Sequence, residues 1–342
     1  MRRVDNPPNP YLSEHRELLG PPPPVQLEVY EERAASILTH NDSPDIPFRW
    51  TVNPYRGCQH ACAYCYARRT HEYLGLGAGT DFESRIIVKI NAPELLAKEL
   101  ARPAWRQENI AFSGVTDAYQ PLEAVYRITR RCLEACLAAA NPVGIVTKSY
   151  LIVRDTDLLV ELHRRAHVSV SFSIPFADAQ VARRLEPHAP PPARQFEAMR
   201  RLATAGVPVG ILLAPIIPGL NDRDIPQLLK QAVECGAGQA AYAPVRLPGS
   251  VQQVFLSRLR AELPDAAARI EQRTRELRGG QLNDPRFGYR MQAAGAYWES
   301  VTRLFETTAT RLGLDCGQPW RQNQCPVPGE RSRPRQLSLF KT

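Results

Sequence analysis

Apolar and polar residues alternate along the middle of the chain with two different periods. Between about Phe48 and Pro244, short apolar or β-branched runs are separated by longer runs in which apolar residues recur every three or four positions. The short runs predict seven strands, at residues 48–52, 85–90, 109–114, 143–148, 168–174, 207–215 and 239–245. The longer runs predict helices at residues 92–100, 124–140, 155–166 and 192–206, the last capped by Gly206. This alternation is typical of β-α units around a parallel sheet and predicts an α/β barrel or partial barrel.

The segments on either side of this pattern differ from it. Residues 1–45 contain the runs PPNP and GPPPP, which favour extended polyproline conformation, so we expect an arm that wraps or links rather than a core. Residues 46–248 hold the β-α pattern. A helical pattern then continues up to about Leu312, within a predicted extension at residues 249–327. Residues 328–342 are basic and contain proline, and they predict a flexible tail.

Composition narrows the class of protein. At 342 residues, with 44% hydrophobic and 23% charged residues, the chain has the composition of an ordinary soluble protein. Its longest apolar run, residues 209–220, is short and interrupted by Pro215 and Pro218, so we expect a cytoplasmic protein that does not span a membrane. The net charge of +8 permits contact with nucleic acid or another polyanion. Eight cysteines, three of them clustered, favour a reducing compartment and a metal site over a disulfide framework.

The three clustered cysteines, Cys58, Cys62 and Cys65, form the pattern C-x3-C-x2-C directly after the first predicted strand. A closed structural zinc site would need four protein ligands, and neither His60 nor His71 stands at a standard zinc-finger spacing from these cysteines. Three cysteines can instead bind three irons of a [4Fe-4S] cluster and leave the fourth iron open to another ligand. A zinc site or a set of reduced thiols is the alternative.

With the aromatic Tyr64 before its third cysteine, this loop resembles the cluster loop of the radical S-adenosylmethionine (SAM) superfamily. The resemblance implies a partial (β/α)6 TIM-like barrel and an open iron that SAM chelates. It also implies that the reduced cluster cleaves SAM to methionine and a 5′-deoxyadenosyl radical, which abstracts hydrogen from a substrate. An electron donor such as flavodoxin or ferredoxin would reduce the cluster. Tyr64 would pack near the adenine of SAM, or alternatively would only fill the mouth of the barrel.

Further segments resemble the spore photoproduct lyase-like branch of that superfamily. They are FSGVTDAYQPLE at 112–123, VTK at 146–148, SFSI at 171–174, LEP at 185–187 and APIIPGLND at 214–222. By this resemblance Thr116 and Asp117 touch the methionyl group of SAM, Lys148 lies near its carboxylate and Ser173 near its ribose. The alternatives are a turn or helix N-cap for Thr116 and Asp117, and a solvated strand-end charge for Lys148.

The resemblance breaks down at Gly114, which stands where the lyase carries its hydrogen-donor cysteine. Reversal of a thymine dimer by the lyase's route is therefore not expected. Among the remaining cysteines, Cys132 and Cys136 share one helical face and are expected to be packed in the core. Cys235 stands at a helix end and is expected to be structural. Cys316 and Cys325 lie in a turn-rich stretch and are too few for a second cluster.

The pentapeptide QLSLF at residues 336–340 resembles the motif by which bacterial proteins dock on the replicative sliding clamp. In this interpretation Leu337, Leu339 and Phe340 fill an apolar pocket while Gln336 hydrogen-bonds at a second site. The alternative is a terminal apolar plug that folds back on the barrel.

Together these features predict a radical SAM enzyme that acts on nucleic acid, as in DNA repair. One alternative keeps the radical chemistry and directs it at a protein, peptide or small metabolite. A rival from another class is a non-catalytic metal-cluster protein that associates with DNA.

Overall fold

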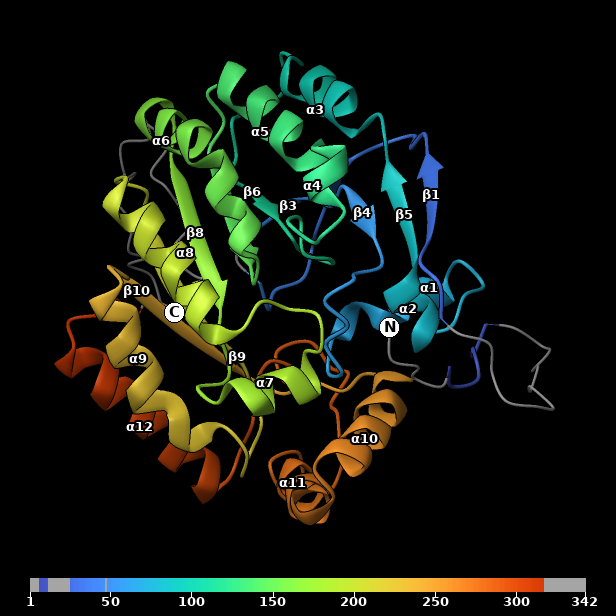
Figure 1. Cartoon of the computed structure of the whole chain (residues 1–342), viewed down its shortest axis with the longest axis vertical. Helices are drawn as coiled ribbons and strands as arrows, with labels where there is room; N and C mark the ends of the chain where they lie inside the picture. Colours follow the sequence, from blue (N-terminus) through green and yellow to red (C-terminus); the bar gives the residue numbers. More distant parts are fainter. Residues whose placement is uncertain (1–5, 12–24, 47, 317–342) are drawn as a thin grey trace, which may run out of the picture.

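A seven-stranded sheet forms the centre of the computed structural model, which describes residues 6–11, 25–46 and 48–316 (Figure 1). The strand order is β10-β9-β8-β7-β6-β3-β2. The first six strands of that order pair in parallel, and β2 runs antiparallel to β3. Since β10 and β2 are the two edges, the sheet is open, and the predicted partial (β/α)6 arrangement is confirmed. The strands are β2 Leu38–His40, β3 Trp50–Val52, β6 Ile110–Phe112, β7 Val143–Thr147, β8 Val168–Ser173, β9 Val209–Ile216 and β10 Gln239–Pro244.

A second, three-stranded sheet has the order β1-β5-β4. It consists of β1 Glu28–Glu32, β4 Tyr55–Arg56 and β5 Arg85–Lys89. The strand predicted at residues 85–90 therefore exists, but it pairs with β1 and β4 and is not part of the large sheet. The described part of the proline-rich arm also contributes two strands, β1 and β2, which the sequence pattern did not indicate. The residues of β1 are mostly exposed, so backbone pairing stabilises this strand and no hydrophobic alternation marks it.

Five helices connect successive strands of the large sheet on its outside (Figure 1). They are α3 Ala92–Leu100, α5 Ile128–Ala138, α6 Thr156–Arg165, α8 Pro192–Thr204 and α9 Ile225–Glu234. The single helix predicted at 124–140 is wrong, because the chain breaks at Arg127, where φ is 52°, between α4 (Glu123–Tyr126) and α5. The carboxylate of Glu123 accepts hydrogen bonds from the backbone N–H groups of Thr129 (2.9 Å) and Arg130 (3.3 Å). These bonds satisfy free donors at the start of α5, so the break is stabilised.

Shorter helices lie near the carboxyl ends of the strands, and three longer ones follow β10. The short helices are α1 Arg69–Glu72, α2 Thr80–Ser84 and α7 Ala179–Leu185, with 3-10 turns η1 Tyr66–Arg68, η2 Tyr150–Asp155 and η3 Asp222–Asp224. The longer helices are α10 Val251–Glu262, α11 Pro264–Glu276 and α12 Ala296–Arg311. The predicted helical extension is therefore interrupted by turns at residues 277–295, where Gly279, Gly280 and Gly288 have positive φ angles.

The core is formed by both faces of the parallel strands and by the inner faces of the helices. All but one of the residues of β9 are buried, as expected when helices cover a parallel sheet. Cys132 and Cys136 are fully buried on α5, and Cys235 is 1% exposed, so the expected structural placement of these three thiols is confirmed. In the described part of the chain no helix is long and apolar enough to cross a membrane.

Gly206 ends α8 in the left-handed conformation, with φ of 86°, as the sequence predicted. An added Cβ would meet no atom within 4 Å, so a substitution there changes only the backbone energy. We expect Gly206→Ala to destabilise the protein by about 1 kcal/mol. The measurement is the urea midpoint of the reconstituted protein.

The matched control is Gly238→Ala. Gly238 also has open space around the added Cβ, but its φ lies outside the left-handed region. Equal urea midpoints for the two variants would contradict the conformational explanation.

Candidate active site

The three clustered cysteines lie in the loop between β4 and η1, beyond the carboxyl end of β3. All three are free thiols; Cys58 and Cys62 are 7% and 8% exposed, and Cys65 is half-buried. Burial raises the pKa of the Cys62 thiol well above its ordinary value, and Glu186, Cys65 and Cys58 raise it further. Cys65 packs against the apolar cluster that holds Cys62 and against the one that holds Cys58, and its backbone N–H donates to the carbonyl of Cys62 (3.3 Å). The loop therefore brings the three cysteines into one neighbourhood.

Arg68 fixes the conformation of this cysteine loop. Its guanidinium is fully buried and pairs with the buried carboxylate of Glu83. It also donates to four backbone carbonyls at 2.9–3.1 Å, those of Ala61, Cys62, Ala78 and Gly79. An arginine has five N–H donors, and these contacts use all of them. This role could not be predicted from the sequence, because Arg68 stands in a basic run that is typical of a solvated surface.

Two glutamines connect the cysteine loop to the loop after β6. The side chain of Gln120 donates to the carbonyl of Gly57 (3.1 Å) and accepts from the backbone N–H of Gln59 (3.0 Å). In return, the side chain of Gln59 accepts from the backbone N–H of Leu122 (2.9 Å). Gln120 is fully buried. The cysteine loop therefore keeps a fixed position relative to the segment that carries Thr116 and Asp117.

Asp117 is a buried hydrogen-bond acceptor at the ends of β6 and β7. One of its oxygens accepts from the Thr147 hydroxyl (2.8 Å) and the Tyr119 N–H (2.9 Å). The other accepts from the Lys148 N–H (2.8 Å) and lies 3.3 Å from Nδ1 of the buried His60. Burial acts to raise the pKa of Asp117, but His60 and these hydrogen bonds together lower it below its ordinary value. The carboxylate therefore holds two strand ends and the cysteine loop together.

Thr116, next to it, is also buried, and its hydroxyl donates to the carbonyl of Tyr55 (3.1 Å) in β4. Neither Thr116 nor Asp117 caps α4 through its side chain. Their predicted contact with SAM stays a prediction.

Lys148 lies at the centre of a buried polar cluster. Its ammonium is 2.9 Å from Oε1 of Glu186 and donates to the carbonyl (2.9 Å) and hydroxyl (3.1 Å) of Ser173. The hydroxyl of Tyr64 hydrogen-bonds to the same carboxylate of Glu186. Burial lowers the pKa of Lys148 and raises the pKa of Glu186 to about 8. Lys148 is 8% exposed, so the alternative of a solvated strand-end charge is wrong.

The structure thus brings Tyr64, Lys148 and Ser173 into one cluster with Glu186, and His60 contacts the neighbouring Asp117. Glu186 follows α7 and stands in the LEP segment, which the sequence analysis noted only as a resemblance. His60 lies between two cysteines at no recognisable catalytic spacing. Their proximity to the cysteine loop could not be read from spacing, because Glu186 is more than 100 residues away from Tyr64 along the chain.

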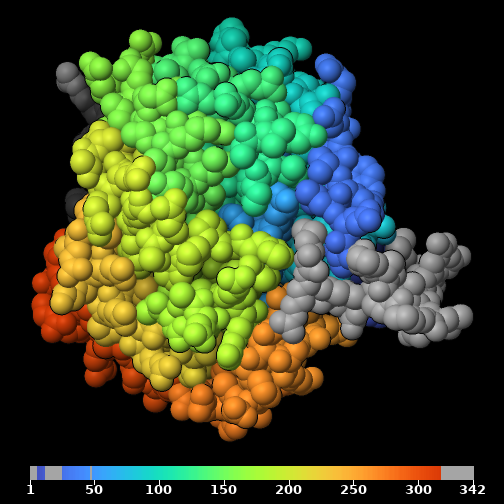
Figure 2. All heavy atoms as spheres, viewed as in Figure 1, coloured from blue at the N-terminus to red at the C-terminus, as the bar shows by residue number. Residues whose placement is uncertain are grey.

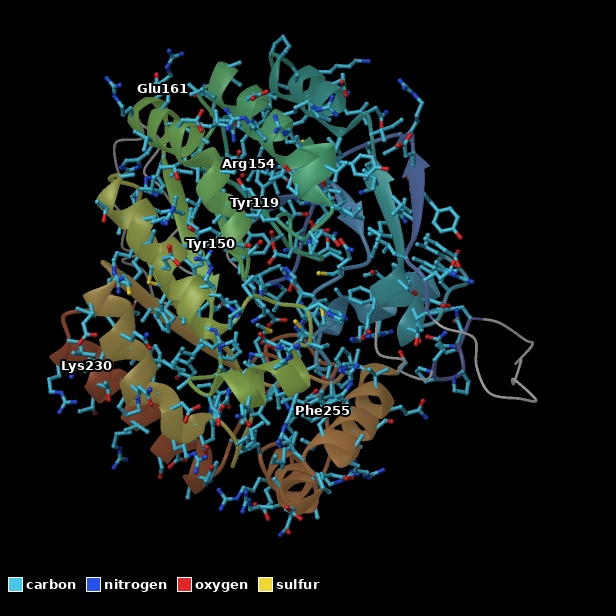
Figure 3. The ribbon with its side chains drawn as sticks, viewed as in Figure 1. Tyr119, Tyr150, Arg154, Glu161, Lys230 and Phe255 are labelled. Atoms are coloured by element: carbon cyan, nitrogen blue, oxygen red, sulfur yellow. The ribbon has the colours of Figure 1, made fainter. Side chains whose placement is uncertain are left out.

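A second buried network, centred on Glu123 and Asp155, also holds the loop after β6. Arg154, labelled in Figure 3, donates to the carboxylates of Glu123 (2.7 Å) and Asp155 (2.8 Å). Glu123 also accepts from the hydroxyl of Tyr55 at 2.5 Å. Both carboxylates are fully buried, so these charges depend on their partners. The network joins β4, which precedes the cysteine loop, to the start of α5.

Three thiols in one loop are the ligand type that an iron–sulfur cluster uses. Within the described residues, no three His, Cys, Asp or Glu side chains are grouped so that they could hold one ion. The thiolates that bind an iron–sulfur cluster each bind a different iron, so they surround the cluster and do not converge on a point. A buried loop that carries three thiols supplies the ligands that such a cluster needs.

Figure 2 shows the surface of the molecule coloured by residue number. In this view a small area of blue atoms, from the early part of the chain, is bordered by green atoms from its middle part.

Comparison with known sequences gives a family and several relatives. A sequence model of the radical SAM superfamily matches residues 52–232, more than half of the chain. The chain is 37% identical over 229 residues to an uncharacterised protein of Mycobacterium tuberculosis, covering 66% of this chain and 67% of that protein. It is 31% identical to an uncharacterised protein of Methanocaldococcus jannaschii, covering 58% and 71%. It is 24% identical to the radical SAM Nalpha-GlyT isomerase of Pseudomonas phage M6, covering 78% and 54%.

Solved structures with a similar fold include two of spore photoproduct lyase. One is complexed with dinucleoside spore photoproduct, with a TM-score of 0.62, 17% identity, and coverage of 84% of this chain and 80% of that one. The other is a variant with bound AdoMet and dinucleoside spore photoproduct, with a TM-score of 0.61, 18% identity and the same coverage. The sequence match and the cysteine loop show that the chain belongs to the radical SAM superfamily and is a radical SAM enzyme, which implies an iron–sulfur cluster and SAM as its cofactors.

Proposed function

We propose that Cys58, Cys62 and Cys65 bind three irons of a [4Fe-4S] cluster, and that the enzyme uses this cluster to cleave SAM reductively. The observation that carries the proposal is the neighbourhood of three free thiols in a loop fixed by Arg68. When bound and reduced, the cluster supplies an electron that splits SAM into methionine and a 5′-deoxyadenosyl radical, which takes hydrogen from the substrate.

The protein's own residues bind, orient and shield this centre. Cys62 belongs to an apolar cluster that includes Tyr64, Phe176 and Ile217, and its thiol is largely shielded from water. The rings of Tyr64 and Phe176 lie 6.4 Å apart, so Tyr64 has an apolar neighbour against which an adenine could also pack. This arrangement supports the assignment of Tyr64 to SAM.

Lys148 and Ser173 are proposed to hold the polar groups of SAM. A buried ammonium is a strong donor to a carboxylate, and that of Lys148 is already aimed by three contacts, to Glu186 and twice to Ser173. The hydroxyl of Ser173 also donates to the carbonyl of Ala214 (3.0 Å), which fixes its orientation. Asp117 and Thr116 are proposed to contact the methionyl group. The protein donors around Asp117 keep its carboxylate ionised and in place for the SAM ammonium.

Nucleic acid is the proposed substrate class. The net charge of +8 supports it, and the structural neighbours include spore photoproduct lyase with a dinucleoside photoproduct. Gly114 stands where a hydrogen-donor cysteine would be expected, and its carbonyl accepts from the Tyr66 hydroxyl (2.5 Å). The reaction is therefore proposed to differ from thymine-dimer reversal. A protein, peptide or small metabolite is the second candidate substrate class. The rival hypothesis of a non-catalytic DNA-associated protein is wrong, because the family match shows a radical SAM enzyme.

The remaining partners follow from this chemistry. A cluster that must be reduced for each cycle needs an electron donor such as flavodoxin or ferredoxin, and a reducing compartment such as the cytoplasm.

The proposed docking of Gln336, Leu337, Leu339 and Phe340 on a bacterial sliding clamp concerns residues outside those described, as does any role of Cys325. Cys316 is half-buried, and its thiol points to the carbonyl of Leu314 (3.6 Å).

Anaerobic reconstitution tests the cluster directly. We expect the wild type to bind about four irons and, once reduced, to convert SAM to 5′-deoxyadenosine. Cys62→Ala should lose both properties, because one iron then has no ligand. The control is Cys136→Ala, which removes a buried thiol on α5 that the cluster does not use. Stoichiometric zinc without SAM cleavage in the wild type would sink the proposal.

A second prediction concerns Lys148. Lys148→Met keeps an apolar stem of similar length and removes the charge, so we expect SAM to bind about tenfold more weakly or worse while iron content stays near wild type. Equilibrium binding to the reconstituted protein measures this. The double variant Lys148→Met/Glu186→Gln also removes the buried carboxylate that would otherwise lose its partner. If the double variant binds SAM like wild type, Lys148 has only a structural role.

The tail generates a third prediction. A peptide of residues 331–342 should bind a bacterial sliding clamp at roughly micromolar strength, about −8 kcal/mol. Calorimetric titration measures this affinity. Unchanged binding of the doubly substituted peptide Leu339→Ala/Phe340→Ala would show that the attraction comes from its basic residues alone.

A further inference from the structure

Arg246 lies just after β10, next to the cysteine loop, and one of its donors has no partner. Its guanidinium stacks over the ring of Tyr66 at 5.8 Å from the centroid, and Tyr66 directly follows Cys65. Its Nη1 reaches only the thioether of Met291 (3.1 Å), a weak acceptor. Its Nε is buried and has no hydrogen-bond partner among the described residues. A buried arginine donor without an acceptor costs free energy unless a ligand supplies the acceptor.

Two more arginines, Arg278 and Arg290, lie near Arg246. Arg278 donates to backbone carbonyls only, at Val245 (2.8 Å), Gln292 (3.0 Å) and Arg290 (3.4 Å). Arg290 pairs with Asp45 (2.5 Å), which comes from the N-terminal arm. Burial and then Arg246 lower the pKa of Arg278 to about 10, and burial and then Arg290 lower that of Arg246. Arg246 therefore lies close enough to both Arg278 and Arg290 for like charges to repel, and a bound anion would relieve that repulsion.

Two exposed aromatic rings lie beside these arginines, in the connector between α11 and α12. Phe287 and Tyr289 are each 59% exposed. Arg290 lies over the ring of Phe287 at 4.3 Å, and Arg286 lies over that of Tyr289 at 4.5 Å. Exposing a large aromatic ring to water costs free energy. Here a guanidinium covers one face of each ring, and the other face is free to stack on a planar partner.

The charges of this surface do not balance. Its four arginines are Arg246, Arg278, Arg286 and Arg290. They face two carboxylates, those of Asp45 and Asp284, and Asp284 is bound by Arg286 (2.7 Å). Tyr66 is the remaining titratable group in the described surroundings of Arg246, and it is neutral at physiological pH. Four positive charges against two negative ones leave an excess of two beside the cysteine loop.

We propose that this surface binds a single strand of nucleic acid, with a phosphate at Arg246 and bases stacked on Phe287 and Tyr289. Aromatic rings interleaved with arginines are the usual platform for unpaired bases, because each base offers a flat face and each phosphate a charge. Only the identification of that strand as the substrate of the radical chemistry rests on the proposed function. The surface itself is argued from residues 246–292 and their contacts.

A phosphate at Arg246 would lie beside Tyr66 and thus beside the cluster ligand Cys65. The Tyr66 hydroxyl donates to the carbonyl of Gly114, so Tyr66 joins the cysteine loop to the end of β6 at this point. Base readout is not required for such binding, which predicts tolerance of sequence and a strong dependence on salt. An acidic peptide would use the arginines but would gain nothing from the two rings.

Fluorescence anisotropy with a labelled twelve-nucleotide oligothymidylate and the reconstituted protein tests this surface. Phe287→Ala/Tyr289→Ala should weaken binding about tenfold or more, because stacking is lost. Arg246→Gln should weaken it and reduce the slope of log affinity against log salt by about 0.7, the share of one phosphate contact on a single strand. The matched controls, Tyr30→Ala on β1 and Arg164→Gln on α6, remove an exposed ring and an exposed arginine elsewhere and should bind like wild type.

Iron content and thermal midpoint are measured for every variant, so that loss of binding by a misfolded protein is recognised. Wild type that cleaves SAM but does not bind the oligonucleotide would overturn the inference and leave the proposed cofactor chemistry intact. Oligonucleotide binding without SAM cleavage would support the inference and overturn the proposed cofactor chemistry. The inference also fails if a polyglutamate of the same length binds as tightly as the oligonucleotide, or if the double aromatic variant binds like wild type.

Discussion

The candidate active site depends on one buried guanidinium, that of Arg68. A charge without solvent is costly, and this one is stabilised because all five of its donors find acceptors, four carbonyls and the carboxylate of Glu83. Two of those carbonyls belong to Ala61 and Cys62 in the cysteine loop. A change in the loop's conformation would therefore leave the buried guanidinium without some of its hydrogen-bond acceptors. A lysine offers three donors from a single point and could not replace this geometry.

Around this fixed loop, the strand ends are joined by polar contacts that cross long stretches of sequence. Asp117 connects the ends of β6 and β7 to His60, and Glu186 connects Tyr64 to Lys148 and through it to Ser173 at the end of β8. Buried networks of this kind keep side chains in one rotamer, because moving any member leaves another unsatisfied. The site is therefore organised before a ligand arrives, which is what the proposed binding of SAM by these groups requires.

The surface proposed to meet the substrate strand is built differently. It draws on the N-terminal arm, the end of β10 and the connector after α11. Its contacts combine exposed ring stacks with a mostly buried charge pair and hydrogen bonds to backbone carbonyls. The Asp45 and Arg290 side chains meet across 245 residues of sequence. This division suits the two tasks, since the cofactor site is common to a superfamily while the substrate surface differs from one enzyme to the next.

Several features were determined by the sequence alone. The alternation of short apolar and longer amphipathic runs predicted the six parallel strands, three of the helices between them and the cap at Gly206, because periodicity is a local property of the chain. The spacing of Cys58, Cys62 and Cys65 predicted the family for the same reason: ligands of one loop are fixed by their separation along the chain.

Tertiary structure decided the rest. The pairing of residues 85–89 with β1 depends on contact with a distant segment, and the turns at residues 277–295 contact Asp45 and Val245. The break at Arg127 is stabilised by Glu123, whose carboxylate is in turn bound by Tyr55 and Arg154. The burial of Arg68, the place of Glu186 beside Lys148 and the group of arginines around Arg246 also depend on contacts with distant segments. A charged residue has the same sequence signature on a solvated face and in a buried network, and only the packing of other elements around it determines which of the two it is.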